Sequence, residues 1–312
     1  QRRNEMKCDL VLEGGGAKIG GLVGAIAAIE QAGFEPARLA GTSSGAITAA
    51  LVAAGYSSDE LKTIMDSLDF ESFKDGASWG RKIPNLLMKR GVYEGKVFYE
   101  TMKELLKAKG VETFGDLRDG EAISTSHQHR LRMFCTDLTQ AKLVTWPDDA
   151  ALYGLSPDHM EVAWALRTSM SIPYVFQPVR LSGSYFVDGG VLSNFPIWVF
   201  DSHSAPRHPT FGINLWEADS GLPHEITGSI SYLEALVKAS LEAHDKRFVR
   251  PGDFENRVIQ VPIGNVRATD FGLSIQQKDK LYHAGYHAAK NFLDEWSWES
   301  YQSWAKEIRG IL

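Results

Sequence analysis

The sequence predicts an α/β fold built around parallel strands, because residues 7–55 read as two consecutive strand–loop–helix units. In the first unit, an apolar strand at residues 8–12 runs into three glycines at residues 14–16. An apolar helix follows and stops at Gly33. Repeated units of this kind imply parallel strands joined by right-handed crossovers. The carboxyl ends of such strands lie at one edge of the sheet, where open α/β sheets place their sites.

The second unit carries the motif G-x-S-x-G, written Gly-Thr-Ser-Ser-Gly at residues 41–45. The motif lies between a short extended run after Pro36 and an Ala-rich helix at residues 46–54, which Gly55 ends. This is the setting of a nucleophile elbow, a strand-to-helix turn that presents a serine hydroxyl at the sheet edge. The alternative is a turn whose serine only caps the helix.

The glycine loop at residues 14–16 predicts a second part of the same site. Its bare backbone amides stand at a helix N-terminus, and two adjacent parallel units bring them beside the serine. An oxyanion hole requires N–H donors in that position. The loop lacks the G-x-x-x-x-G-K-[ST] pattern of a phosphate loop and the glycine spacing of a dinucleotide fingerprint.

Composition argues against several classes of function. The 312 residues are 44% hydrophobic and 23% charged, as in ordinary globular proteins. A net charge of -6 argues against a nucleic-acid partner. No apolar run reaches the ~20 residues of a membrane span, and the N-terminus has no hydrophobic signal core. Cys8 and Cys135 suit neither a disulfide framework nor a metal site, so we expect buried thiols in a reducing, cytoplasmic compartment.

No repeat, low-complexity tract or interdomain linker is found, so residues 1–312 are predicted to form a single domain. The pattern of apolar residues predicts further helices and strands along the chain. Helices are expected at residues 57–68, 94–109, 160–170, 232–249 and 275–292, and strands at residues 131–135, 143–146, 211–215 and 257–261. A run at residues 175–179 leads to a hairpin-like segment at residues 181–187.

Two segments have alternative interpretations. The excursion at about residues 70–95 mixes aromatic, glycine and basic residues without a clean period. It is either a lid facing an acyl chain or membrane surface, or an irregular connection that covers the sheet edge. The Trp-rich helix at about residues 296–312 is either an interfacial membrane helix or a docked helix that closes the core, and we favour the docked helix.

A catalytic serine needs a base to take its proton. The histidines that a Ser–His–Asp arrangement could use are His203, His208, His224, His244, His283 and His287. None has a compelling context, and the elbow comes too early for the fold that uses that order. Asp188, in Asp-Gly-Gly at residues 188–190, follows a hydrophobic strand and should emerge at a sheet edge. Burial would raise its pKa from about 3.9 toward a useful range, and the alternative is a simple turn.

Together these motifs resemble those of the patatin-like phospholipase family, in its bacterial form. Residues 13–18 resemble its glycine-rich oxyanion loop, the serine motif matches its elbow, and residues 188–190 match its dyad motif. Residues 167–173 and 191–196 are similar to the family's sequence on either side of the Asp-Gly-Gly. The likeness extends from about residue 7 to about residue 292.

The resemblance implies a three-layer α/β/α sandwich with a mostly parallel central sheet. It also implies a metal-independent hydrolase, without a cofactor, that cleaves fatty-acyl esters of lipids and phospholipids through an acyl-enzyme. Ser43 would be the nucleophile and Asp188 the base, with the amides of Gly15, Gly16 and Ala17 as the oxyanion hole. The expected partners are a lipid substrate and, peripherally, a membrane surface.

One residue departs from the family's pattern, which has glycine directly after the basic residue Lys18. Ile19 stands there instead, so the packing of the loop or the width of the pocket is expected to differ. Lys18 itself either serves a phosphate or carboxylate or faces solvent. The same site would also suit an acyltransferase or thioesterase, or a lipid-sensing module without turnover.

Overall fold

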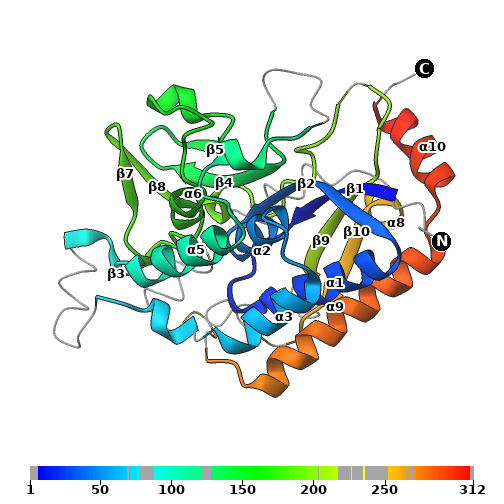
Figure 1. Ribbon diagram of the computed structural model, residues 1–312, viewed down its shortest axis with the longest axis horizontal. Helices are drawn as coiled ribbons and strands as arrows, with labels where there is room; N and C mark the ends of the chain where they lie inside the picture. The colour runs from blue at the N-terminus through cyan, green and yellow to red at the C-terminus, as the bar shows by residue number, and fades with distance from the viewer. Residues whose placement is uncertain are drawn as a thin grey trace.

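The computed structural model describes residues 6–68, 70–76, 88–120, 128–202, 204–216, 226, 235, 252–264, 266, 270 and 272–309. Within these residues an eight-stranded sheet forms the centre of the molecule (Figure 1). Its strands are β1 (Met6–Leu12), β2 (Phe34–Thr42), β4 (Leu131–Asp137), β5 (Lys142–Trp146), β7 (Val179–Leu181), β8 (Ser184–Asp188), β9 (Thr210–Trp216) and β10 (Val258–Pro262).

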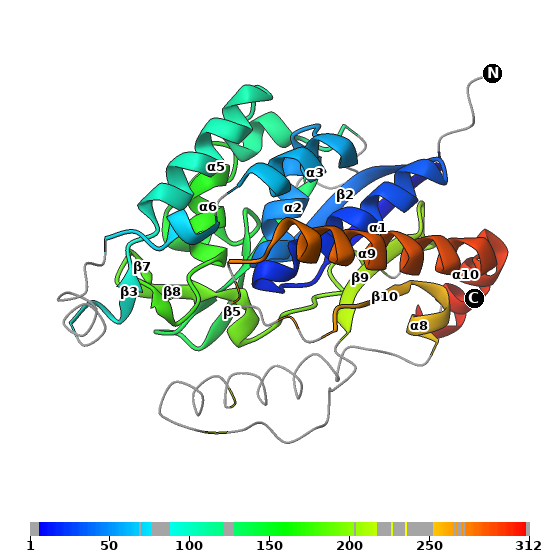
Figure 2. The same ribbon diagram turned by 90° about the horizontal axis from the view of Figure 1, so that it is seen from below.

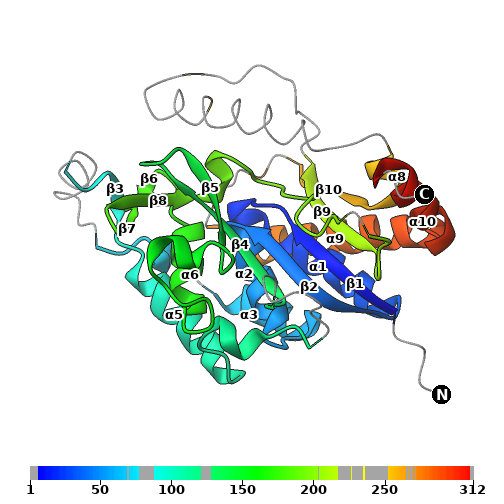
Figure 3. The ribbon, with the colours of Figure 1, turned by 90° about the horizontal axis from the view of Figure 1, so that it is seen from above.

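The strand order is β10-β9-β1-β2-β4-β8-β7, and β5 pairs with β4 off this path. The pairs from β10 to β4 along the path are parallel, and Figure 3 shows β1, β2 and β4 side by side. The pairs of β4 with β5, of β4 with β8 and of β7 with β8 are antiparallel. The predicted α/β class with a mostly parallel central sheet is therefore confirmed.

Helices and short turns connect and cover the strands. The α-helices are α1 (Ile19–Gln31), α2 (Ser44–Ala53), α3 (Ser58–Ser67), α5 (Lys96–Ala108), α6 (Val162–Ser169), α8 (Asp253–Asn256), α9 (Ile275–Glu295) and α10 (Trp298–Arg309). The 3-10 turns are η1 (Gly16–Lys18), η2 (Phe70–Phe73), η4 (Phe114–Leu117), η5 (Ala150–Tyr153) and η6 (Gly189–Val191). A separate two-stranded sheet joins β3 (Gly91–Tyr93) to β6 (Tyr174–Phe176). Apart from the segment at 232–249 and the run at 175–179, the predicted helices and strands are found to within a few residues. The run at 175–179 divides between β6 and β7, and the hairpin-like segment at 181–187 is formed by the end of β7 and by β8.

The sheet has a different apolar cluster on each face. Leu10 and Leu12 of β1 belong to the large cluster that includes α1, α2 and α9, whereas Val11 belongs to a second cluster with Phe195 and Ile197. The alternation follows from the two-residue period of a strand. Cys8 and Cys135 are free and buried, and burial raises the pKa of both thiols.

Helices α1 and α9 run side by side and approach closely (Figures 1 and 2). A Cβ at Gly24 would lie 1.9 Å from the carbonyl oxygen of Tyr282, and a Cβ at Gly285 would lie 1.9 Å from that of Gly21. Only glycine therefore fits at Gly24 and Gly285 while the two backbones keep this distance. The contact brings α9 onto the helix that begins at the glycine loop.

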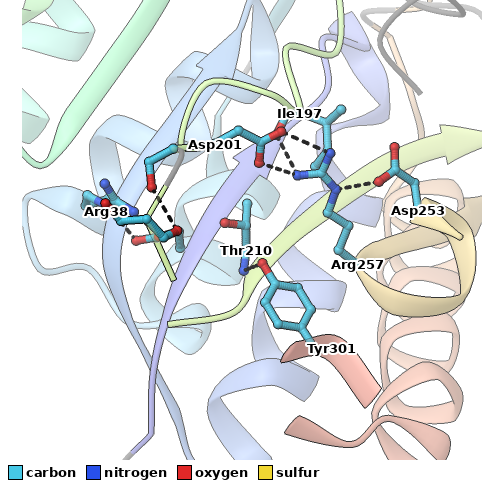
Figure 4. A network of polar contacts seen from close by, with 10 residues as sticks. Arg38, Ile197, Asp201, Thr210, Asp253, Arg257 and Tyr301 are labelled. Carbon is cyan, nitrogen blue, oxygen red and sulfur yellow. Dashed lines mark hydrogen bonds and ion pairs between the residues drawn. The ribbon is translucent and has the colours of Figure 1, made fainter. Parts of the chain in front are cut away.

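The C-terminal helix α10 is docked on the end of the sheet (Figure 4). Tyr301 is fully buried, and its hydroxyl accepts a hydrogen bond from the Thr210 N–H at 3.0 Å. Beside it, the buried Arg257 guanidinium pairs with Asp201 and Asp253, each at 2.7 Å. A buried aromatic side chain that bonds a strand is not available to a membrane surface.

Several predicted features lie wholly or partly outside the described residues. These are residues 77–87 of the 70–95 excursion, the helix at residues 232–249 except for residue 235, residues 310–312 of the tail, and His203, His224 and His244. At the described ends of the excursion, Phe73 packs edge-to-face on Phe98 at 5.3 Å, and β3 pairs with β6. In the described part of the chain, no helix is both long and apolar enough to cross a membrane.

We expect Gly24→Ala to lower the free energy of unfolding by about 1–3 kcal/mol, because the added methyl group must push α9 away. Helix propensity alone would favour Ala by up to ~1 kcal/mol, so the sign of the change separates the two effects. Urea unfolding followed by circular dichroism measures it. Gly120→Ala is the control, since a Cβ there meets no atom of the described residues within 4 Å. A Gly24→Ala protein as stable as the wild type would contradict the close approach.

Candidate active site

Ser43 stands at the sharp turn between β2 and α2. Its backbone has φ 54 and ψ -125, a conformation that non-glycine residues rarely adopt and that costs on the order of 1–3 kcal/mol. The turn is tight because α2 starts against β1, and a Cβ at Gly45 would lie 2.2 Å from the Leu12 carbonyl oxygen. The geometry is that of the predicted elbow.

A hydrogen-bonded serine on α6 supports this turn from behind. The Ser43 N–H donates to Ser169 Oγ at 3.0 Å, and the Ser169 hydroxyl donates to the Phe134 carbonyl oxygen at 2.7 Å. Ser169 is completely buried. It therefore ties the strained residue to β4, where the pairing of β2 ends.

Strands β2 and β8 meet end to end along one side of β4. Thr42, the last residue of β2, pairs with Phe134, and Asp188, the last residue of β8, pairs with the next residue, Cys135. β5 occupies the other side of β4 over the same residues, so β2 and β8 share one side. The residue that follows β2 and the residue that ends β8 are thereby brought together. These are Ser43 and Asp188.

Asp188 is buried and only partly hydrogen-bonded. Its Oδ1 accepts from the Gly190 N–H at 2.8 Å, whereas Oδ2 is buried and has no hydrogen-bond partner among the residues that the structure describes. Burial raises the pKa of Asp188 to about 7, against the opposing effects of the Ser43 hydroxyl and the Gly190 N–H. Near neutral pH, both the ionised and the protonated carboxyl are thus populated.

The Ser43 hydroxyl donates to Met170 Sδ, with Oγ and Sδ 3.4 Å apart. A thioether sulfur is a weak acceptor. The hydroxyl lies close enough to Asp188 to lower the pKa of that carboxyl, yet Oδ2 accepts no bond of ordinary length. In this conformation, the sulfur is therefore the acceptor that the Ser43 hydroxyl uses.

The glycine loop lies directly against Ser43. A Cβ at Gly14 would be 3.1 Å from the Cβ of Ser43 and 2.3 Å from Asn194 Oδ1. The Gly15 N–H donates to Ser44 Oγ at 2.9 Å, so it is engaged in this conformation. Gly16 has φ 55 and begins η1. No preceding turn supplies an acceptor for the N–H groups of Gly16 and Ala17.

Glu13 and Asn194 hold this loop in place. Glu13 Oε1 accepts from Asn194 Nδ2 at 3.2 Å, and Oε2 accepts from Asn214 Nδ2 at 2.8 Å and from the Leu215 N–H at 2.5 Å. Asn194 Nδ2 also donates to the Gly14 carbonyl oxygen at 2.8 Å. The carboxylate therefore links the loop to β9 and to the segment after Asp188.

Some of these supporting residues were not singled out by sequence reasoning. Ser169, Met170 and Asn194 lie within stretches that resemble the family, but no local pattern indicates which atoms they contact. Lys18 is buried, so its solvent-facing alternative is wrong. Ile19, which follows it, is also buried.

Of the candidate histidines, His208, His283 and His287 lie in the described residues. His283 and His287 stack on each other on α9, and His283 pairs with Asp279 at 3.4 Å. His208 precedes β9 and therefore lies toward the amino ends of the parallel strands, opposite the site. Among the residues that the structure describes, no group of three or more His, Cys, Asp or Glu side chains could hold a metal ion.

Comparisons with known proteins agree with this geometry. The sequence pattern of the family described as patatin-like phospholipase matches residues 10–201. The chain is 36% identical over 303 residues to YqhO of Bacillus subtilis, an uncharacterized protein, covering 94% of this chain and 100% of YqhO. It is 25% identical over 313 residues to lysophospholipase NTE1 of Debaryomyces hansenii, covering 92% of this chain and 18% of NTE1.

A solved structure adds evidence on the fold. VipD from Legionella pneumophila is similar with a TM-score of 0.57 and 20% sequence identity, covering 94% of this chain and 67% of VipD. The family pattern at residues 10–201 takes in the glycine loop, the elbow and the Asp-Gly-Gly. The resemblance seen in the motifs is thus confirmed, and the chain belongs to the patatin-like phospholipase family of lipid hydrolases.

Proposed function

We propose that the protein cleaves fatty-acyl esters of lipids with Ser43 as nucleophile and Asp188 as base. The observation that carries the proposal is the buried Asp188 Oδ2, which has no hydrogen-bond partner in the described part of the chain although its carboxyl lies next to the Ser43 hydroxyl. Unpartnered polar atoms are rare in protein interiors and call for an explanation. The explanation that we propose is that Oδ2 accepts the proton of Ser43 during the reaction.

In the first half of the reaction, Ser43 Oγ attacks the ester carbonyl carbon and its proton passes to Asp188 Oδ2. The N–H groups of Gly16 and Ala17 hold the oxyanion, while Gly15 keeps the loop bonded to Ser44. The intermediate then collapses, the alcohol takes the proton from Asp188, and the acyl group stays on Ser43. Water repeats the sequence with the same aspartate and releases the fatty acid.

The raised pKa of Asp188 suits this role. A base works best when its pKa lies near the operating pH, since it must be ionised and still attract a proton. An exposed aspartate would be almost fully ionised but a poor proton acceptor. Burial raises the pKa of Asp188 to about 7, and the N-termini of η1 and α2 favour the negative charge that develops on the substrate.

Lipid esters, phospholipids included, are the substrate class that the family supports. We also propose that the enzyme is cytoplasmic and that it contacts, peripherally, the membrane that presents such lipids. The transfer of the acyl group to an alcohol instead of water would make the protein an acyltransferase. Product analysis in the presence of a competing alcohol separates the two.

We expect Ser43→Ala and Asp188→Asn each to lower kcat/KM for a short-chain ester by at least about 10³-fold, because the nucleophile and its base act together and neither works without the other. The double variant should lose little more. A fluorophosphonate probe should label the wild type at Ser43 and leave Ser43→Ala unlabelled, with Ser67→Ala as the control. An unlabelled wild type would instead indicate a lipid-sensing module, and a retained activity in Asp188→Asn would exclude this base.

The pH dependence of activity should follow the ionisation of Asp188. We expect kcat/KM to rise with pH through about 7 and then to level off, because only the ionised carboxyl accepts the serine proton. Initial rates between pH 5 and 9 with an uncharged ester measure this. A flat profile across that range would contradict the assignment.

The contribution of Asp188 to the free energy of unfolding should fall as the pH rises, whereas the activity should increase. A carboxyl whose pKa is raised on folding, here from 3.8 to about 7, stabilises the fold fully below pH 4 and loses that contribution as the pH rises to 7. The free energy of unfolding of Asp188→Asn minus that of the wild type should therefore rise by on the order of 4 kcal/mol between pH 4 and pH 8. Urea unfolding of both proteins at the two pH values measures the difference. An unchanged difference would mean that the carboxyl has no raised pKa.

A further inference from the structure

Two arginines stand on one tyrosine ring at the β7–β8 hairpin, at the opposite end of the molecule from α10 (Figures 1 and 3). Arg180 of β7 lies opposite Tyr185 of β8, and residues paired in this way present their side chains on the same face. The guanidinium carbon of Arg180 is 4.8 Å from the centroid of the Tyr185 ring, and that of Arg90, which precedes β3, is 4.9 Å from it. We call these three residues the hairpin cluster.

The two positive charges of the hairpin cluster have no counter-charge among the described residues. Arg90 and Arg180 are both exposed, and neither forms an ion pair within the described part of the chain. The acidic residue nearest to Arg90 in the sequence, Glu94, already pairs with Lys89 at 3.2 Å. The chain as a whole carries a net charge of -6, so this local excess of positive charge runs against the average. It indicates an anion from outside the chain.

Strand pairing places the hairpin cluster beyond the candidate site, at the same edge of the sheet. β4 runs parallel to β2 and continues past its end, where Cys135 pairs with Asp188. Three residues further along β4, the Leu138 N–H donates to the Tyr185 carbonyl oxygen at 2.9 Å. At the rise of a strand, Tyr185 therefore lies about 10 Å farther out than Asp188. The cluster thus projects on the side from which a substrate approaches the carboxyl ends of the strands.

Exposed apolar side chains flank the hairpin cluster. Leu138, in the turn after β4, is 50% exposed, and Tyr174, which pairs with the residue after Arg90, is 46% exposed. The acid of that turn, Asp137, is fully buried and accepts hydrogen bonds from the turn's own N–H groups, so it does not offset the positive charge. Tyrosine rings, exposed apolar groups and basic side chains are the combination that suits the surface of a membrane with anionic lipids.

We propose that the hairpin cluster is the surface through which the protein docks on membranes that contain anionic phospholipids. The inference rests on the proposed function, because it assigns residues and a lipid charge to the proposed membrane contact. A guanidinium group can bind two phosphate oxygens through parallel N–H groups. The Tyr185 ring holds both guanidinium groups in place, so less side-chain freedom is lost when they bind lipid phosphates. Docking there turns the edge of the sheet that carries Ser43 toward the lipid.

The test is co-sedimentation with vesicles of ether-linked phosphatidylcholine, either alone or with one third of the lipid replaced by ether-linked phosphatidylglycerol. Ether lipids contain no acyl ester, so binding is measured without hydrolysis. We expect the wild type to bind the anionic vesicles more strongly than the neutral ones and to be released as the salt concentration rises. Arg90→Gln and Arg180→Gln should each lower the partition coefficient about fivefold, and the double variant about 25-fold.

Lys107→Gln is the matched control, because it removes one positive charge from an exposed side chain in the last turn of α5, outside the hairpin cluster. It should bind as the wild type does, and circular dichroism checks that every variant is folded. The salt dependence of the wild type tests the same claim without a substitution. The proposal is overturned if the wild type binds neutral and anionic vesicles equally, or if the arginine variants bind as well as Lys107→Gln.

Two further measurements separate this inference from its alternatives. Calorimetry with inorganic phosphate should show no saturable binding, and binding that Arg90→Gln abolishes, without binding to vesicles, would indicate a site for a small anion and overturn the membrane surface. A protein that cleaves a short-chain ester through Ser43 but does not bind anionic vesicles would support the hydrolase and overturn the docking surface. A protein that docks through the hairpin cluster but cleaves no ester would support the surface and overturn the hydrolase.

Discussion

The candidate site depends on how β2 and β8 share one side of β4. β2 runs parallel to β4 and pairs as far as Phe134, and β8 runs antiparallel and pairs from Cys135 onward. Two strands of opposite direction that meet on one side of a third must bring their carboxyl ends together. Ser43 follows one of these ends, and Asp188 is the other. The pairing, rather than any direct bond between the two side chains, is what holds them near each other.

The place where β2 and β8 meet also accounts for the raised pKa of Asp188 and for the positive φ of Ser43. Asp188 lies inside the sheet, where water is excluded, and one backbone N–H is too little to offset the burial, so its pKa rises to about 7. The positive φ of Ser43 is maintained because Ser169 bonds both its N–H and the Phe134 carbonyl oxygen. The Ser43 hydroxyl and the Asp188 carboxyl are thus positioned by strand pairing and by the buried Ser169 hydroxyl.

Much of the fold was predictable because its signals are local. The Ser57–Glu60 capping box starts α3 as expected, and the two-residue alternation along β1 divides its side chains between the two faces. The three glycine motifs could be recognised because tight turns and close backbone contacts restrict residue type over a few positions. The partners of those motifs were not predictable. Ser43 meets Ser169 and Met170, and Gly14 meets Asn194, residues that no periodicity or short pattern connects across so long a stretch of chain.

The sequence by itself determined the order and kind of the secondary structure elements, the elbow, the glycine loop and the candidate dyad, because each depends on residues adjacent in the chain. Only the tertiary structure decided which loop amide is already engaged, namely that of Gly15 with Ser44. It also decided that Asp188 Oδ2 is buried without a hydrogen-bond partner among the described residues. These are properties of side chains packed together from distant segments, and they exist only once the sheet and its covering helices have assembled.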